Sequence, residues 1–267
     1  MSIIPCPGFQ AAGMAAGIKK NGRKDLGLIV CDGPAAVAGL FTRNRVQAAP
    51  VLLDRERVGL GLSRAVIVNS GNANCCTGAD GYRNAVRMTR AAADRLGVAE
   101  ELVLVASTGV IGAPLPVERI EMALPELMAS LAPEGVTDFA EAIMTTDRVP
   151  KAVSRQAEIG GRRVTVTGVV KGAGMIRPDV ATMLCFLMTD VRAPAEHLRA
   201  FLAAGAERSF NCITVDGDTS TNDTILLLAS GRSGVDVDDP AHRTAFQALL
   251  DEVMLALAKW VVKDAEG

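Results

Sequence analysis

A nearly uninterrupted apolar run, ATMLCFLM at 181–188, follows a stretch rich in turn-forming residues, KGAGMIRPDV at 171–180. Gly and Pro ahead of such a run predict a tight connection that leads into a buried strand. A second interpretation concerns Thr182, the first polar residue of the run, whose hydroxyl is placed for chemistry. The rest of the chain has to decide between these two interpretations.

Other short apolar segments are bounded by Gly, Asp or Pro, which favours strands at 27–33, 35–42, 65–71 and 101–108. Four segments have the composition or periodicity of helices: 82–96, 116–131, 195–210 and a last one from about Pro240. Gly160-Gly161 lies between two alternating segments and predicts a hairpin with a tight turn. The mixture predicts an α/β or α+β chain.

Two helices carry more specific signals. Pro125 predicts a kink or a split in the helix at 116–131. Asp239 followed by Pro240 is typical of a helix start. In that last helix, apolar side chains at three- and four-residue spacing predict one buried stripe: Phe246, Leu249, Leu250, Val253, Met254, Leu257 and Val261.

Composition excludes several classes of protein. The 267 residues suffice for one large domain or two ordinary ones, and 49% hydrophobic with 22% charged residues is ordinary for a globular chain. A net charge of −2 gives no footprint for nucleic acid. No apolar run reaches about 18 residues, and the N-terminus lacks the basic and apolar regions of a signal peptide. We therefore expect a cytoplasmic protein without nucleic-acid or membrane partners.

The cysteines and histidines do not indicate a metal site. The six cysteines are scattered without a C-x-x-C pair, which favours reduced packing residues. His197 and His242, the two histidines, lie among charged neighbours in helical segments, which favours the surface. A Ser-His-Asp or Cys-His mechanism would need one of these two. The segment DGDTSTND at 216–223 lacks the ligand spacing of a calcium loop.

Three polar clusters lie on expected turns beside apolar strands: VNSGNANCCTG at 68–78, ASTGVIG at 106–112 and ITVDGDTSTNDT at 213–224. Successive backbone N–H groups in such turns can converge on a negatively charged oxygen. Each cluster taken alone is typical of an ordinary turn.

Taken together, ordered blocks of this chain resemble one family. GFQAAGMAAGIKKNGRKDLGLIV, VNSGNAN, TGVIG, MTTD, KGAGMIRPDVATML and TVDGDTSTNDT resemble the bifunctional ornithine acetyltransferase/glutamate N-acetyltransferase (ArgJ-type) family of arginine biosynthesis. The resemblance extends over nearly the whole chain. It implies an α/β fold, an α-β-β-α sandwich with stacked β layers, of the self-cleaving N-terminal-nucleophile type.

The resemblance also implies a use for Thr182. Family members cut themselves at an Ala-Thr bond, here Ala181-Thr182, which would give an α-chain region at 1–181 and a β-chain region at 182–267. Thr182 would then be the nucleophile. An N-terminal threonine carries its own α-amine as general base, so this chemistry needs no histidine.

The same resemblance assigns further site residues. It implies that Thr108 and Gly109 stabilise the oxyanion and that Lys171 binds a substrate carboxylate. Thr146 is the expected substrate-contacting threonine, with Thr145 as the alternative. The resemblance implies that Glu266 holds the substrate's α-amine. We expect the block at 213–224 to shape the wall of the site.

The implied reaction is acetyl transfer from N2-acetylornithine to glutamate through an acetyl-threonine intermediate. No metal or cofactor is expected, although some relatives also accept acetyl-CoA as donor. The implied assembly is an α2β2 heterotetramer. An amidohydrolase or aminopeptidase with the same nucleophile is an alternative, and a non-catalytic fragment is another.

Three departures from the family pattern affect these expectations. Asp179 replaces a usual Asn three residues before Thr182, and Arg148 replaces a usual Thr. The family normally continues for well over a hundred residues beyond this point, with an Asn and a Thr that contact substrate. We therefore expect slow or incomplete self-cleavage and poor acetyl transfer by the 267-residue chain.

Overall fold

The structure, a computed structural model, describes residues 3–177 and 183–265. Its strands form one eight-stranded sheet in the order β4-β3-β2-β8-β7-β6-β5, with β1 paired to β2. The strands are β1 Phe9–Met14, β2 Leu26–Phe41, β3 Leu62–Asn72, β4 Val103–Val110, β5 Lys151–Ile159, β6 Arg162–Lys171, β7 Leu184–Thr189 and β8 Thr224–Ala229. The α-helices are α1 Ala49–Val58, α2 Gly78–Leu96, α3 Val117–Ala129, α4 Val136–Ala142, α5 Ala195–Glu207 and α6 Pro240–Lys263.

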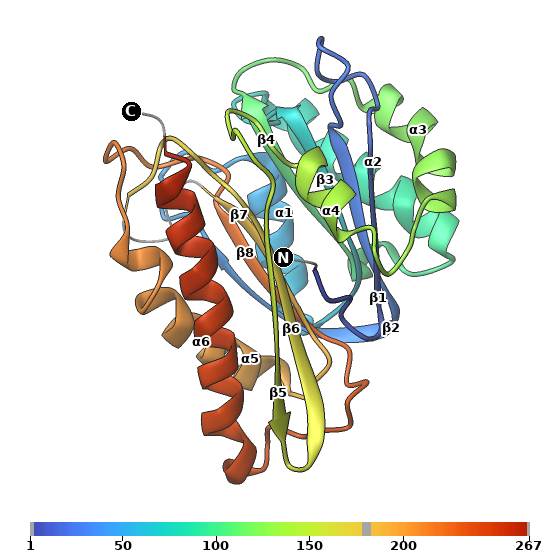
Figure 1. Ribbon diagram of the computed structural model, residues 1–267. Helices are drawn as coiled ribbons and strands as arrows, with labels where there is room; N and C mark the ends of the chain where they lie inside the picture. The colour runs from blue at the N-terminus through green and yellow to red at the C-terminus, as the bar shows by residue number, and fades with distance from the viewer. Residues whose placement is uncertain (1–2, 178–182, 266–267) are drawn as a thin grey trace.

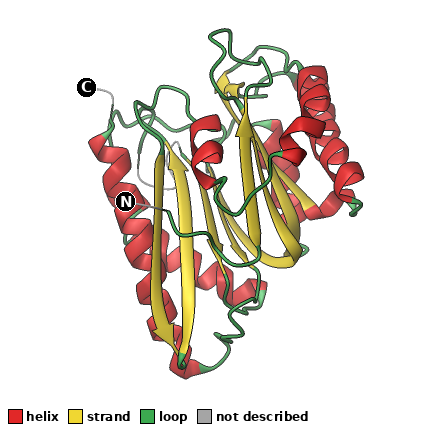
Figure 2. Ribbon diagram, turned by 45° about the vertical axis from the view of Figure 1, so that its right-hand side comes forward, coloured by secondary structure: helices red, strands yellow, loops and turns green. Residues whose placement is uncertain are grey.

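The two halves of the sheet are stacked layers that share one core. Alternate side chains of β3 and β4 pack in this core against alternate side chains of β6, β7 and β8, together with α4. The opposite side chains of β2–β4 pack against α1–α3, and those of β5–β8 against α5 and α6. Figure 1 shows α5 and α6 on one side and α2 and α3 on the other, with the strands between them. The predicted four-layer α-β-β-α sandwich is therefore confirmed (Figure 2).

The strand β2 belongs to both layers. Its first part pairs with β1 and β3, and its last part pairs with β8. We expected two separate strands at 27–33 and 35–42 because Asp32, Gly33 and Pro34 are turn formers. Instead one strand continues, and its register against β3 shifts between Val30 and Ala35. Pro34, which has no N–H to donate, falls in this irregularity, where the ladder is already interrupted.

The local signals gave mixed results. Gly160 and Gly161 have φ of 58° and 72° and join β5 to β6, which confirms the hairpin. The Asp239 side chain caps α6 by accepting the N–H of Ala241 (2.9 Å), and all seven side chains of the expected stripe are buried. Pro125 was expected to kink or split its helix, and the split was wrong, because α3 runs through Pro125. Burial of Leu124 and Leu127 offsets the one hydrogen bond that Pro125 cannot make. The sequence patterns did not predict four elements of the structure: β1, α1, α4 and β8.

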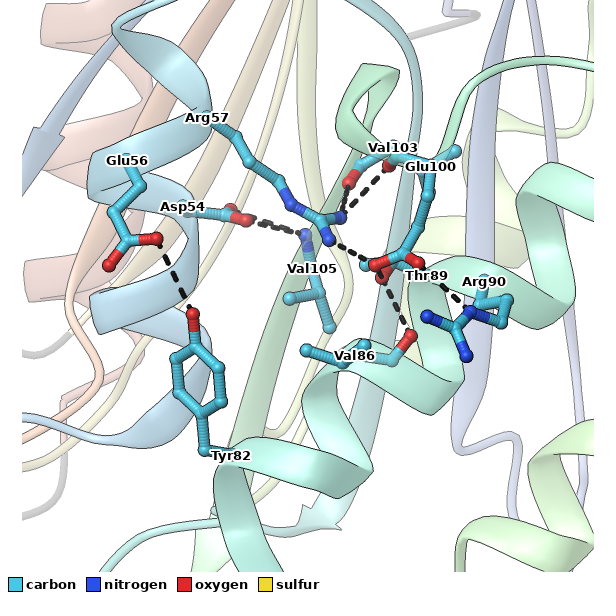
Figure 3. Close-up of polar contacts among 10 residues, drawn as sticks. All are labelled: Asp54, Glu56, Arg57, Tyr82, Val86, Thr89, Arg90, Glu100, Val103 and Val105. Carbon is cyan, nitrogen blue, oxygen red and sulfur yellow. Dashed lines mark hydrogen bonds and ion pairs between the residues drawn. The ribbon is translucent and has the colours of Figure 1, made fainter. Parts of the chain in front are cut away.

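Side chains of α1 bond to the edge of β4 that has no neighbouring strand among the described residues (Figure 3). The buried carboxylate of Asp54 accepts the N–H of Val105 at 2.9 and 3.2 Å. The Arg57 guanidinium donates to the carbonyl oxygens of Glu100 (3.0 Å) and Val103 (2.6 Å). These bonds replace a neighbouring strand and fix β4. Among the described residues no helix is long and apolar enough to cross a membrane.

We expect Asp54→Leu to lower the free energy of unfolding by about 1–3 kcal/mol, because the N–H of Val105 would be buried without an acceptor. Asp54→Asn keeps an acceptor oxygen and should cost less. Urea denaturation of both variants measures the difference. Equal stability of the Leu variant and the unsubstituted chain would show that α1 does not support this edge through Asp54.

Candidate active site

A cavity of about 510 Å³ lies at one edge of the sheet, where several strand ends meet. The parallel strands β3 and β4 end here, with Gly71 opposite Gly109 in the register. β6 ends at the same edge, and the parallel strands β7 and β8 begin there, with Leu184 opposite both Lys171 and Thr224. Loops at this edge therefore come from both halves of the folded sheet, so residues distant in the sequence share one hollow.

Four of the expected site residues line this cavity: Thr108, Gly109, Thr146 and Lys171. Ala181, Thr182 and Glu266 lie outside the described residues, as does Asp179. Thr145 aside, the sequence analysis assigned no individual role to the other lining residues, among them Lys19, Asn21, Gly71, Asp216, Thr221 and Asn222. Lys19 and Asn21 belong to the first block of the family resemblance, and that membership was the one available signal for them.

The end of β4 requires glycine. Gly109 has φ of 133°, and a Cβ at this position would lie 2.4 Å from the carbonyl carbon of Gly71. Both facts exclude a larger residue without movement of the backbone. Thr108, immediately before it, is buried and also borders the cavity. Two adjacent lining residues thus carry a hydroxyl and a main-chain N–H, the donor types that stabilise an oxyanion.

Lys171 lies at the end of β6 and donates from Nζ to the Thr145 hydroxyl (3.2 Å). Both Thr145 and Thr146 line the cavity, so both stay candidates for the substrate-contacting threonine. Asp147 follows them and accepts the N–H groups of Gly172 (2.7 Å) and Thr145 (2.9 Å). Burial acts to raise the pKa of Asp147, but Lys171 and Lys151 outweigh it and hold that pKa below its usual value.

A buried ion cluster supports this corner of the site. The Lys151 ammonium, which is buried, lies 2.6 Å from Asp147 and 2.5 Å from Asp264. Asp264 follows α6 and also accepts the N–H of Arg148 (3.1 Å). One lysine therefore links the loop that holds Thr145 to the C-terminal end of α6. The Lys151 ammonium thus supplies a positive charge beside two buried carboxylates.

The segment at 213–224 forms part of the cavity wall. The Asp216 carboxylate accepts the N–H groups of Met175 (2.5 Å) and Ile176 (2.9 Å) and so holds the loop after β6. The Asn222 amide donates to the carbonyl oxygens of Ala73 (2.7 Å) and Ser107 (2.8 Å). Asn222 thus ties this segment to the ends of β3 and β4.

Asp223 lies where β7 begins. It accepts the Met183 N–H (3.1 Å), and its other oxygen has no hydrogen-bond partner within the described parts of the chain. Burial raises the pKa of Asp223 to about 7, although Lys171 opposes the shift. A carboxyl group that titrates near neutral pH therefore anchors the residue that follows Thr182.

Within the described parts of the chain, metal ligands are not gathered at this site. In residues 3–177 and 183–265 no three His, Cys, Asp or Glu side chains lie together as a metal site. His197, which is half-buried, contacts Asp238, and the His242 ring contacts the carbonyl oxygen of Asp236. All six cysteines are free thiols, four buried and two exposed, Cys76 and Cys212.

The fold is that of the N-terminal-nucleophile class. The L-aminopeptidase D-Ala-esterase/amidase from Ochrobactrum anthropi, described as a new variant of the Ntn hydrolase fold, matches with a TM-score of 0.59. The match covers 99% of this chain and 86% of that one at 15% identity, a level that concerns the fold alone.

Within this class, the chain belongs to the ArgJ family, whose model matches residues 10–267. The arginine biosynthesis bifunctional protein ArgJ of Geobacter sulfurreducens is 50% identical over 97% of this chain and 67% of its own length. That of Symbiobacterium thermophilum is 51% identical over 97% and 66%. The chain thus spans about two thirds of the length of these relatives.

A solved structure of an ornithine acetyltransferase in complex with ornithine, from Mycobacterium tuberculosis, is 38% identical and has a TM-score of 0.59. The match covers 66% of this chain and 94% of that one. The ArgJ structure from Bacillus halodurans is 42% identical with a TM-score of 0.63, over 68% and 94%.

The ion cluster generates a stability prediction. Lys151→Met should lower the free energy of unfolding by about 3–5 kcal/mol, because Asp264 and Asp147 would stay buried without the ammonium that lies between them. Arg83→Met, which removes an exposed ion pair with Asp80, should cost less than about 1 kcal/mol. Urea denaturation of the two variants makes the comparison, and equal losses would contradict a special role for the buried cluster.

Proposed function

We propose that this chain carries acetyl-transfer chemistry, moving the acetyl group of N2-acetylornithine to glutamate through an acetyl ester of Thr182. The observation that carries the proposal is the meeting of Thr108, Gly109, Thr146 and Lys171 at one cavity in a member of the ArgJ family. These residues come from separate parts of the chain. The ornithine complex of the Mycobacterium tuberculosis relative supports a substrate of this type.

The proposed reaction has two half-reactions. The α-amine of Thr182 accepts the proton of its own hydroxyl as the oxygen attacks the acetyl carbonyl carbon. Thr108 and Gly109 donate hydrogen bonds to the oxyanion that forms. The C–N bond then breaks, the α-nitrogen of ornithine takes the proton, and the acetyl group remains on Thr182. The α-amine of glutamate next attacks this ester, and Thr182 recovers its proton.

Lys171 is proposed to bind a substrate carboxylate, and Thr146 to contact the substrate. Burial of Lys171 and its bond to Thr145 hold the ammonium at the cavity wall, which reduces the entropy lost on binding. The role of Glu266 in holding the substrate's α-amine also stays a proposal.

Self-cleavage between Ala181 and Thr182 is the proposed source of the free α-amine, with residues 1–181 and 182–267 as the two products. β7 pairs with β6 on one side and β8 on the other, so hydrogen bonds would hold the products together after the cut.

The proposal includes an α2β2 assembly. It also includes acetyl-CoA as a second acetyl donor. Incubation of the chain with glutamate and either N2-acetylornithine or acetyl-CoA shows which donor it uses. Acetylglutamate as product supports transfer, whereas free acetate without acetylglutamate would support hydrolysis by the same nucleophile.

Thr182→Ala should abolish both self-cleavage and acetyl transfer, because the variant has no nucleophilic oxygen. Intact-mass spectrometry should then show one species near 27.9 kDa, whereas the unsubstituted chain also gives two fragments split after Ala181. Thr182→Ser keeps the hydroxyl and the α-amine and should keep part of both activities. Transfer by the Ala variant would exclude Thr182 as nucleophile.

Thr108→Val should lower kcat roughly a hundredfold with little change in KM, because the oxyanion forms in the transition state and not in the bound substrate. Thr108→Ser keeps the hydroxyl and is the matched control. Initial rates of acetylglutamate formation measure both constants. An effect on KM alone would place Thr108 in substrate binding instead of catalysis.

A further inference from the structure

Two lysines, Lys19 and Lys171, line the cavity together with one acidic residue, Asp216. The Asp216 carboxylate already accepts main-chain N–H groups from Met175, Ile176 and Asp218. Asp216 therefore holds loops at the cavity wall. Two ammonium groups from different halves of the folded sheet lie at the same cavity.

The loop before β2 is built to hold Lys19 at the cavity. The buried carboxylate of Asp25 accepts the N–H groups of Ala16 (2.6 Å) and Lys19 (2.8 Å). The Lys19 ammonium donates to the carbonyl oxygen of Lys24 (2.7 Å). A Cβ at Gly71 would lie 2.9 Å from Cγ of Lys19, so the missing side chain at Gly71 makes room for the lysine stem. Both ends of the Lys19 side chain are thus fixed.

The Lys19 ammonium still has donors for a ligand. An ammonium carries three N–H donors, and Lys24 takes one of them. Over residues 3–177 and 183–265 the structure gives the other two no hydrogen-bond partner. Lys20, the next residue, is exposed and does not line the cavity, so the chain offers a matched control one position away.

We propose that Lys19 is a specificity-determining residue for the acetyl acceptor, and that its ammonium binds the second carboxylate of a dicarboxylic amino acid. This inference rests on the proposed function and deepens it. Lys171 binds the carboxylate that donor and acceptor share. Lys19 binds the side-chain carboxylate that glutamate has and ornithine lacks.

The environment of Lys19 also suits a cavity that receives side chains of opposite charge in turn. The donor N2-acetylornithine ends in an ammonium, and the acceptor ends in a carboxylate. Burial lowers the pKa of Lys19 to about 8, with Lys171 and Arg23 adding to the shift and Asp25 and Asp147 opposing it. At pH 7 such a group is deprotonated about a tenth of the time, against about one part in 3,000 for a free lysine. Lys19 can therefore release its proton to admit the donor and regain it for the acceptor.

The test is equilibrium binding of glutarate and butyrate to the 267-residue protein, followed by ligand-observed NMR. Glutarate has two carboxylates at the spacing found in glutamate, and butyrate has one. The unsubstituted chain should bind glutarate more tightly than butyrate. Lys19→Met should weaken glutarate binding about tenfold or more and change butyrate binding less than twofold, because it removes one charge pair and leaves Lys171 in place.

Two control variants separate charge from structure. Lys20→Met should leave both affinities unchanged. Lys19→Arg keeps a positive charge and should keep most of the preference for glutarate. Circular dichroism of all variants checks that they are folded, and thermal unfolding of Lys19→Met near that of Lys20→Met confirms that the loop is intact.

The pH dependence provides a readout that a purely structural residue would not change. Glutarate affinity of the unsubstituted chain should fall between pH 7 and 9, as Lys19 loses its proton. In Lys19→Arg this fall should be much smaller, because the guanidinium stays charged. The other charged groups near Lys19 and the cavity are common to both proteins, so their effects cancel in the comparison: Lys171, Arg23, Asp25, Asp147, Asp216 and Asp223.

Equal glutarate binding by Lys19→Met and the unsubstituted chain would overturn the inference, as would binding of glutarate no tighter than that of butyrate. Neither result depends on acetyl transfer. Failure of the proposed function would instead appear as the absence of acetylglutamate from every donor, with the glutarate preference and its loss in Lys19→Met unaffected.

Discussion

The whole architecture depends on β2, because this one strand belongs to both layers of the folded sheet. Its first part pairs with β1 and β3 and its last part with β8, with a register shift between them. Hydrogen bonding therefore continues from one layer into the other, and the inner faces of both halves enclose a single core. Strands in such an arrangement are buried on both faces, which requires side chains that are apolar at successive positions.

The same arrangement creates the site. Because the two layers meet at a common edge, the ends of β3, β4 and β6 lie beside the beginnings of β7 and β8. The rigid strands then fix loops whose residues are far apart in the chain. Asn222 shows how closely they are joined, since its amide bonds carbonyl groups next to the ends of both β3 and β4.

Ion pairs, and not apolar contacts, hold the corner of the site around Lys151. Lys151 pairs with two buried carboxylates, those of Asp147 and Asp264. Asp147 also accepts the main-chain N–H groups of Thr145 and Gly172. Asp25 does the same for the loop that carries Lys19. In each case a buried carboxylate accepts main-chain N–H groups, so a loop without regular structure is ordered beside the cavity.

The sequence by itself determined the features that depend on neighbouring residues: the tight turn at Gly160-Gly161, the cap at Asp239 and the buried stripe of α6. Its ordered blocks also identified the family and predicted site roles for Thr108, Gly109, Thr146 and Lys171, which line one cavity. Only the tertiary structure decided that β2 crosses both layers, that α3 continues through Pro125, and that Lys19 reaches the cavity. These outcomes depend on contacts between distant segments, which local propensity does not contain. Lys19 in particular shares the cavity with Lys171 only because the sheet folds back on itself.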